Sequence, residues 1–142
     1  MAPFFGEGMP VPAMEIDTEP YWEGCKRHKL MIQRCKRCGT YRHSPAPVCH
    51  ECHSFDHEFV ESAGIGEVYT YTIIHMPLHP ATKDQVPYNA VVVQLLDCGG
   101  AKIMSNLVEA RNEDIRIGSR VQVVWDDVSS DISLPRFRLV SQ

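Results

Sequence analysis

The sequence lacks a long apolar run: its longest stretches of consecutive apolar residues, such as residues 90–93, are far short of the roughly 20 residues that cross a bilayer. It also lacks the basic start and apolar core of a secretory signal. These absences predict a cytoplasmic protein with no membrane partner. Thiols usually stay reduced in that compartment, so we do not expect the six cysteines to form three disulfides.

Signatures of the common catalytic sites are also missing. The sequence has no P-loop, no GxGxxG, no GxSxG elbow and no HExxH. His75 lies in a proline-rich stretch and Cys98 in a glycine turn, and the sequence places no base beside either. We therefore expect no catalytic residue on this chain and interpret it as a binding or scaffold module, with an independent enzyme using Cys98 or His75 as the weaker hypothesis.

Acidic residues are absent from one stretch of an otherwise acidic chain. The formal net charge is −4, yet residues 26–42 contain seven basic residues and no acid: Lys26, Arg27, Lys29, Arg34, Lys36, Arg37 and Arg42. Such a patch indicates a local anionic partner, or else a solvated face that balances nearby thiolates.

Two CxxC pairs follow within the same region. Cys35, Cys38, Cys49 and Cys52 are separated by a linker of ten residues, and Gly39 assists the first turn. Zinc accepts four thiolates in a tetrahedron, and a closed set of four protein ligands is typical of structural rather than catalytic zinc. We predict one structural zinc per chain. A redox CxxC, a disulfide framework, or replacement of one cysteine by a nearby histidine (His43, His50 or His53) are the alternatives.

Hydrophobic patterning predicts a mainly β fold. A helix should run from Asp17 or Thr18 to about Lys29, with Tyr21, Trp22 and Cys25 on the stripe that packs against a neighbour. Strands are expected over 30–34, 55–61, 68–74, 90–96, 102–108, 120–128 and 137–140, with loops over 75–87 and 131–137. Cys25 and Cys98 are expected to be buried free thiols.

The order of these elements favours an N-terminal helix and rubredoxin-like zinc ribbon followed by a five-stranded OB-fold barrel, with a small β-sandwich as the alternative. We expect a flexible arm over 1–14, the helix and zinc ribbon over 15–58, and the barrel over 59–142. Zinc ribbons and OB folds also bind single-stranded nucleic acid, which is the alternative function. The barrel argues against it, because residues 68–142 carry seven basic and eight acidic side chains instead of a basic groove.

An ordered set of motifs resembles the acyl-CoA-associated zinc-ribbon and OB-fold family known as domain of unknown function thirty-five. The motifs cover residues 15–140 and comprise Tyr21-Trp22, Lys29-Leu30, Cys35–Gly39, Pro45 or Pro47, Cys49–Cys52, the strand with Gly64, Gly66, Val68 and Thr72, and Pro87-Tyr88. The resemblance implies a scaffold subunit in a hetero-oligomer with a thiolase-fold protein, which supplies the catalytic residues. It also implies a CoA thioester as ligand and carbon–carbon bond cleavage or formation, with benzoylsuccinyl-CoA thiolase as our leading expectation.

The resemblance gives the basic stretch a role. Arg34, Lys36, Arg37 and Arg42 are expected to meet CoA phosphates or the partner's surface, since guanidinium and ammonium groups bind phosphate through charge-assisted hydrogen bonds. The strands of the barrel would then offer an apolar wall to the pantetheine arm.

Overall fold

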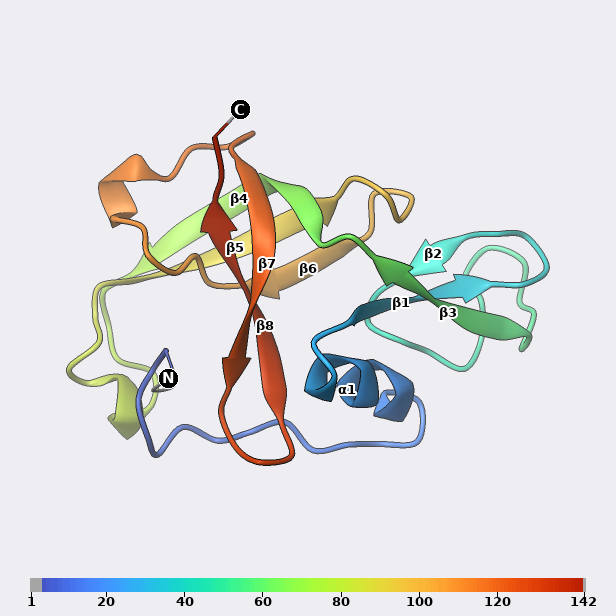
Figure 1. The fold of residues 1–142 in the computed structure, drawn as a ribbon, viewed down its shortest axis with the longest axis horizontal. Helices are drawn as coiled ribbons and strands as arrows, with labels where there is room; N and C mark the ends of the chain where they lie inside the picture. Colours follow the sequence, from blue (N-terminus) through green and yellow to red (C-terminus); the bar gives the residue numbers. More distant parts are fainter. Residues whose placement is uncertain (1–3, 142) are drawn as a thin grey trace.

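The computed structural model describes residues 4–141 as two connected modules (Figure 1). The first, called here the ribbon module, contains α1 (Glu19–Lys26) and a sheet in the order β2-β1-β3, with β1 (Leu30–Cys35), β2 (Tyr41–Arg42) and β3 (His57–Ser62). The second, the barrel, has the order β6-β5-β4-β7-β8, with β4 (Ile65–Ile74), β5 (Tyr88–Leu95), β6 (Lys102–Ser105), β7 (Arg120–Asp127) and β8 (Ser133–Leu139). The 3₁₀ helices η1 (Pro80–Thr82) and η2 (Asn112–Asp114) lie in connections. Among the helices of residues 4–141, none is both long and apolar enough to cross a membrane.

Helix α1 forms where the sequence places it but ends earlier than predicted. Pro20 occupies the first turn and Glu19 adds an acid there, both of which favour a helix start. The helix ends at Lys26 because His28 adopts a left-handed conformation with φ of 59°. The amides of His28 and Lys29 then donate to the carbonyls of Cys25 and Gly24, both at 2.8 Å, which is the Schellman arrangement of a helix C-terminus.

The five-stranded sheet closes into a barrel through the segment after β6. Leu107 bridges to Phe137 in parallel, and the amide of Val108 donates to the Phe137 carbonyl at 2.8 Å. Alternate residues of β5 face the interior, where Val91, Val93 and Leu95 are fully buried. The predicted OB-fold barrel is therefore confirmed.

The prediction of a loop over residues 131–137 is wrong from Ser133 onward, where β8 begins. Pro135 lowered the expectation of a strand because proline cannot donate to a ladder. Its missing N–H costs nothing here, since Pro135 and Phe137 share the side of β8 that faces away from β7. The proline thus occupies a position in which its nitrogen has no ladder partner to lose.

One hydrophobic core runs through both modules. The cluster contains Leu30 and Ile32 of β1, Cys25 of α1, and Val68 and Leu95 of the barrel, all of them nearly or fully buried. Cys25 and Cys98 are both fully buried free thiols, as predicted. Because the modules bury apolar surface against each other, the core opposes movement of one module relative to the other.

Candidate metal centre and adjoining surfaces

Two turns of the same construction carry the four cysteines of the CxxC pairs. In the first turn, the amide of Gly39 donates to the carbonyl of Cys35 at 2.9 Å. In the second turn, the amide of His53 donates to the carbonyl of Cys49 at 2.9 Å. Gly39 and His53 both have positive φ angles, of 78° and 63° respectively. Sequence reasoning recognised the glycine but missed His53 as its structural counterpart. Histidine is only a weak signal for this conformation, because glycine is the usual residue there even though histidine is enriched among the others.

The four thiol sulfurs lie within 4.8 Å of one another. The sulfurs of Cys35 and Cys52 are 3.6 Å apart, as are those of Cys38 and Cys49. A tetrahedral zinc with bonds of about 2.3 Å requires sulfur separations of about 3.8 Å, whereas a disulfide requires about 2.05 Å. The cluster therefore fits a tetrahedral zinc and not two disulfides.

Backbone amides favour the thiolate forms of Cys35 and Cys49. The amide of Cys38 lies 3.5 Å from the Cys35 sulfur and lowers the pKa of that thiol. The amide of Glu51 lies 3.4 Å from the Cys49 sulfur. Hydrogen bonds from backbone amides, with that of Cys52 contributing most, lower the pKa of the Cys49 thiol. These bonds favour the thiolate, which is the form that binds zinc. Within residues 4–141 the cluster contains the four cysteines and no histidine, so the residues present fit a closed, structural zinc site.

The four basic residues predicted to face CoA or a partner occupy two different environments. Arg34 makes an ion pair with Glu58 and donates to the Tyr41 hydroxyl at 3.2 Å. Arg42 is buried and donates to the carbonyl of Ala46 at 2.8 Å. Lys36 and Arg37 are exposed on the first cysteine turn. The exposed pair thus remains available to an anion, while the two other arginines hold the ribbon module together.

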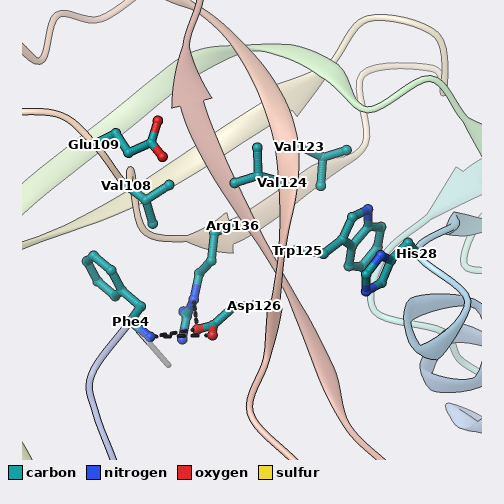
Figure 2. Close-up of a pocket in the computed structure, with 9 residues that line it drawn as sticks. All are labelled: Phe4, His28, Val108, Glu109, Val123, Val124, Trp125, Asp126 and Arg136. Carbon is teal, nitrogen blue, oxygen red and sulfur yellow. Dashed lines mark hydrogen bonds and ion pairs between the residues drawn. The ribbon is translucent and has the colours of Figure 1, made fainter. Parts of the chain in front are cut away.

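A pocket of about 610 Å³ lies on the β7 and β8 side of the barrel (Figure 2). Val108, Val123, Val124 and Trp125 supply apolar surface, and the imidazole of His28 stacks on Trp125 with ring centroids 5.4 Å apart. His28 also lies 2.7 Å from Asp127 and lowers the pKa of that carboxyl group. The barrel strands therefore present an apolar wall at this pocket.

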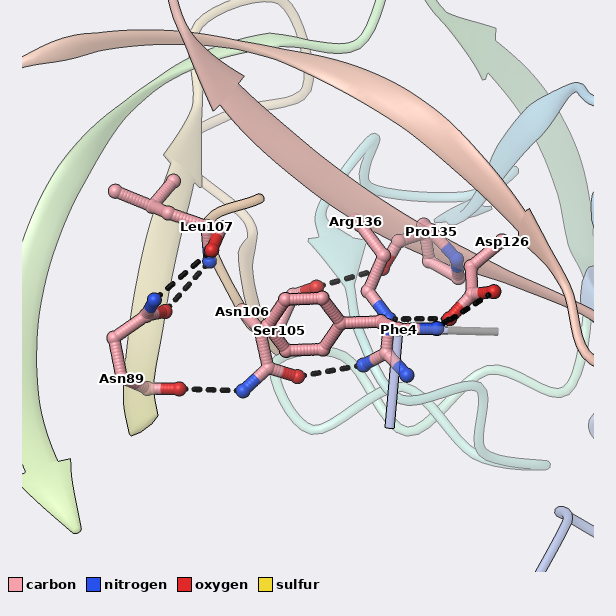
Figure 3. Close-up of polar contacts among 8 residues, drawn as sticks. All are labelled: Phe4, Asn89, Ser105, Asn106, Leu107, Asp126, Pro135 and Arg136. Carbon is pink, nitrogen blue, oxygen red and sulfur yellow. Dashed lines mark hydrogen bonds and ion pairs between the residues drawn. The ribbon is translucent and has the colours of Figure 1, made fainter. Parts of the chain in front are cut away.

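A buried ion pair closes one end of this pocket. Arg136 and Asp126 meet at 3.0 Å with side chains only 12% and 8% exposed, and the Arg136 guanidinium donates to Asn106 at 2.6 Å (Figure 3). The amide of Phe4 donates to the Asp126 carboxylate at 3.2 Å. The side-chain amide of Asn89 donates to the carbonyl of Leu107 and accepts from the Leu107 N–H. No sequence pattern indicated this network, whose members come from five separate segments of the chain.

The weaker catalytic candidates are not arranged for chemistry. Burial raises the pKa of Cys98 to about 11, and the neighbouring Asp97 carboxylate adds to the shift. A buried thiol with so high a pKa is a poor nucleophile. His75 lies in the connection between β4 and β5 and belongs neither to the cysteine cluster nor to the lining of the large pocket.

Two family models match consecutive parts of the chain, and they meet within β3. Residues 22–58 match the family model described as ChsH2, rubredoxin-like zinc ribbon domain, and residues 59–126 match that described as ChsH2, C-terminal OB-fold domain.

Relatives span several named proteins. A probable enoyl-CoA hydratase alpha subunit of Thermomonospora curvata is 40% identical over 129 residues, which are 91% of this chain and 39% of that protein. A DUF35 domain-containing scaffold protein of Methanocaldococcus jannaschii is 33% identical over 115 residues, 78% of this chain and 77% of that protein. A solved chain described as Ltp2-ChsH2(DUF35) aldolase superposes with a TM-score of 0.81 and 40% identity, covering 91% of this chain and 98% of that one. This chain therefore belongs to the DUF35 family, in which a ChsH2-type zinc ribbon is followed by an OB-fold domain.

Proposed function

We propose that this chain is a non-catalytic, zinc-stabilised scaffold subunit of a thiolase-type acyl-CoA enzyme complex. The observation that carries the proposal is the shared core of the ribbon module and the barrel, which fixes two separate surfaces in one orientation. A scaffold needs such rigidity, because a partner is positioned only as well as the support beneath it. Relatives named as a scaffold protein, a hydratase subunit and an aldolase chain support the same role.

In this role the partner supplies the catalytic residues and this chain helps enclose the CoA thioester. Lys36 and Arg37 are exposed and would meet the phosphates, while Arg34 and Arg42 hold the strands beside them through Glu58 and Ala46. The apolar pocket on the barrel offers a wall for the pantetheine arm or for an apolar side chain of the partner.

Reconstitution tests the scaffold role. The chain is co-expressed with a thiolase-fold protein from the same genome, and acyl-CoA cleavage and condensation are measured for each protein alone and for the mixture. We expect a hetero-oligomer in size-exclusion chromatography and turnover only with both chains. Full turnover by this chain alone, or by the partner alone, would overturn the proposal.

Charge reversal tests the CoA contact separately. Replacing Lys36 and Arg37 by glutamate in the reconstituted complex should raise KM for acyl-CoA by about tenfold, since each exposed charge contributes up to about 1 kcal/mol. Lys83→Glu, an equally exposed lysine in the β4–β5 connection, is the matched control and should leave KM unchanged. The double change alters the net charge by twice as much as Lys83→Glu, so an effect of Lys83→Glu on log KM about half that of the double change would show that only net charge matters.

A further inference from the structure

Half of strand β6 has an unpaired outer edge. The carbonyl of Ala101 accepts from the Leu95 amide at 2.9 Å, which makes Leu95 and Ala101 a hydrogen-bonded pair. Such pairs alternate along an antiparallel ladder, so Ile103 and Ser105 also bond to β5, while the backbone groups of Lys102 and Met104 point away from it.

The outer edge is covered farther along the chain but not at these two residues. Beyond β6, the Asn106 carbonyl accepts from Phe137 at 3.1 Å and the Val108 amide donates to Phe137 at 2.8 Å, so β8 occupies the edge there. Among residues 4–141, no hydrogen-bond partner is found for the backbone N–H or C=O groups of Lys102 and Met104. Two donors and two acceptors in register are therefore free to pair with another strand.

These groups border a groove of about 430 Å³ between β6, β8 and α1. Tyr21, Trp22 and His43 form its aromatic wall, and the ring nitrogen Nδ1 of His43 is buried with no partner among the described residues. The Met104 side chain is 75% exposed at the rim, although methionine is apolar. The surface called here the β6 groove consists of the free edge at Lys102 and Met104 and the aromatic wall of Tyr21, Trp22 and His43.

The charge of the β6 groove selects its occupant. Its lining contains the basic residues Lys102 and Arg136 and no acidic residue. Arg136 is already neutralised by Asp126, but the Lys102 ammonium lies over the Tyr69 ring at 4.8 Å and makes no ion pair within the described residues. A second copy of this chain would bring another Lys102 to the same face, which like-charge repulsion disfavours. An acidic segment is favoured.

We propose that the β6 groove binds an extended segment of a partner protein as an added antiparallel strand. Residues opposite each other in an antiparallel pair place their side chains on the same face of the sheet. The partner residue beside Met104 should therefore be apolar, and the residue two positions later, beside Lys102, should be acidic. The recognition sequence is apolar, any residue, then aspartate or glutamate, read from the N-terminus. Main-chain hydrogen bonds supply affinity and the two side chains supply specificity.

The inference deepens the proposed function by naming how a partner would dock, but its test needs no enzyme complex. The full chain is extended at its C-terminus by a flexible Gly/Ser linker carrying the segment Thr-Val-Thr-Glu-Thr, which gives a local concentration of roughly millimolar. Amide hydrogen exchange is then followed by NMR. We expect the Lys102 and Met104 amides to exchange at least about tenfold more slowly than in the chain with a linker alone.

Two variants decide the mechanism. Met104→Pro removes an outward N–H without breaking a bond to β5, so the tethered segment should no longer protect Lys102. Met104→Ala keeps the N–H and should retain most of the protection, and thermal melts of both check the fold. Lys102→Glu should weaken binding of the segment Thr-Val-Thr-Glu-Thr by up to about fivefold. Replacing the glutamate of that segment by lysine should restore binding to the Lys102→Glu chain. Unchanged exchange at Lys102 and Met104 in the tethered chain, or equal protection in both Met104 variants, would overturn the proposal even if the complex with a thiolase-fold protein forms.

Discussion

The carboxylate of Asp97 accepts a hydrogen bond of 2.7 Å from the hydroxyl of Ser62, and so joins the barrel to the last residue of the ribbon sheet. Its second oxygen accepts from the amide of Ala63 at 2.7 Å. The Ser62 hydroxyl also accepts from the Gly64 amide at 3.0 Å, so one carboxylate orders the whole connection between β3 and β4. This connection contributes, with the shared core, to the fixed arrangement of the two modules.

Removing the Asp97 carboxylate should loosen this junction. Asp97→Ala leaves the Ala63 N–H and the Ser62 hydroxyl without their acceptor, which should cost about 1–3 kcal/mol of unfolding free energy. Urea unfolding of the zinc-loaded chain measures it. Asp84→Ala, in the exposed β4–β5 connection, serves as control and should change stability by less than about 0.5 kcal/mol.

The same carboxylate predicts a pH dependence. Although partial burial acts to raise it, the bonds from Ala63 and Ser62 hold the pKa of Asp97 below its ordinary value. A depressed folded-state pKa stabilises the protein above the unfolded pKa of about 3.9, and that stability is lost as pH falls through the folded value. Stability of Asp97→Asn should therefore vary less with pH below about 4 than that of the parent chain. Identical pH profiles would contradict this assignment.

Metal analysis should find one zinc per chain, bound by Cys35, Cys38, Cys49 and Cys52. Chelation should unfold residues 30–55, because the metal no longer ties the two cysteine turns together. Circular dichroism and amide exchange of the ribbon and barrel residues measure the effect separately. Cys52→Ser should abolish zinc binding, whereas Cys98→Ala, outside the cluster, should retain it. A metal-free chain with two disulfides would refute the prediction.

The two cysteine turns offer matched tests of backbone conformation. Gly39→Ala should destabilise the chain by about 1 kcal/mol, because alanine pays for the left-handed conformation that glycine adopts freely. Apart from its two chain neighbours, no residue of the described range 4–141 has a heavy atom within 4 Å of the added Cβ, so the effect is conformational and not steric. His53→Gly should have the opposite sign and stabilise the zinc-loaded chain by up to about 1 kcal/mol. Both values come from denaturant unfolding, and changes of equal sign would contradict the equivalence of the turns.

The buried pair of Arg136 and Asp126 should matter more than an exposed one. Asp126→Ala leaves a buried guanidinium without its partner and should cost about 3 kcal/mol or more. Asp114→Ala breaks the exposed pair with Arg111, whose side chain is 76% exposed, and should cost under about 1 kcal/mol. Thermal or urea unfolding of both variants makes the comparison. Similar losses would mean that water reaches the Arg136 site.

Elements with local signals could be predicted from the amino-acid sequence. The spacing of four cysteines predicted the metal cluster, because each CxxC turn brings two sulfurs together and a linker of ten residues lets the two pairs meet. Alternation in β5 and the N-terminal signals of α1 were also sufficient, since burial of one face follows the period of the pattern. The ordered motifs indicated the family because each motif is a short stretch of the sequence that can be recognised without the fold.

Tertiary structure alone decided which polar groups meet. Arg34 and Lys36 are two residues apart and equally basic in sequence, yet one is paired with Glu58 and the other is exposed, because β1 carries Arg34 beside β3. Arg136 finds Asp126 and Asn106 only when β8 lies between β7 and the segment after β6. The free edge of Lys102 and Met104 depends in the same way on where β8 stops covering β6. Contacts between distant segments depend on the order and register of the strands, and neither can be predicted from a local sequence pattern.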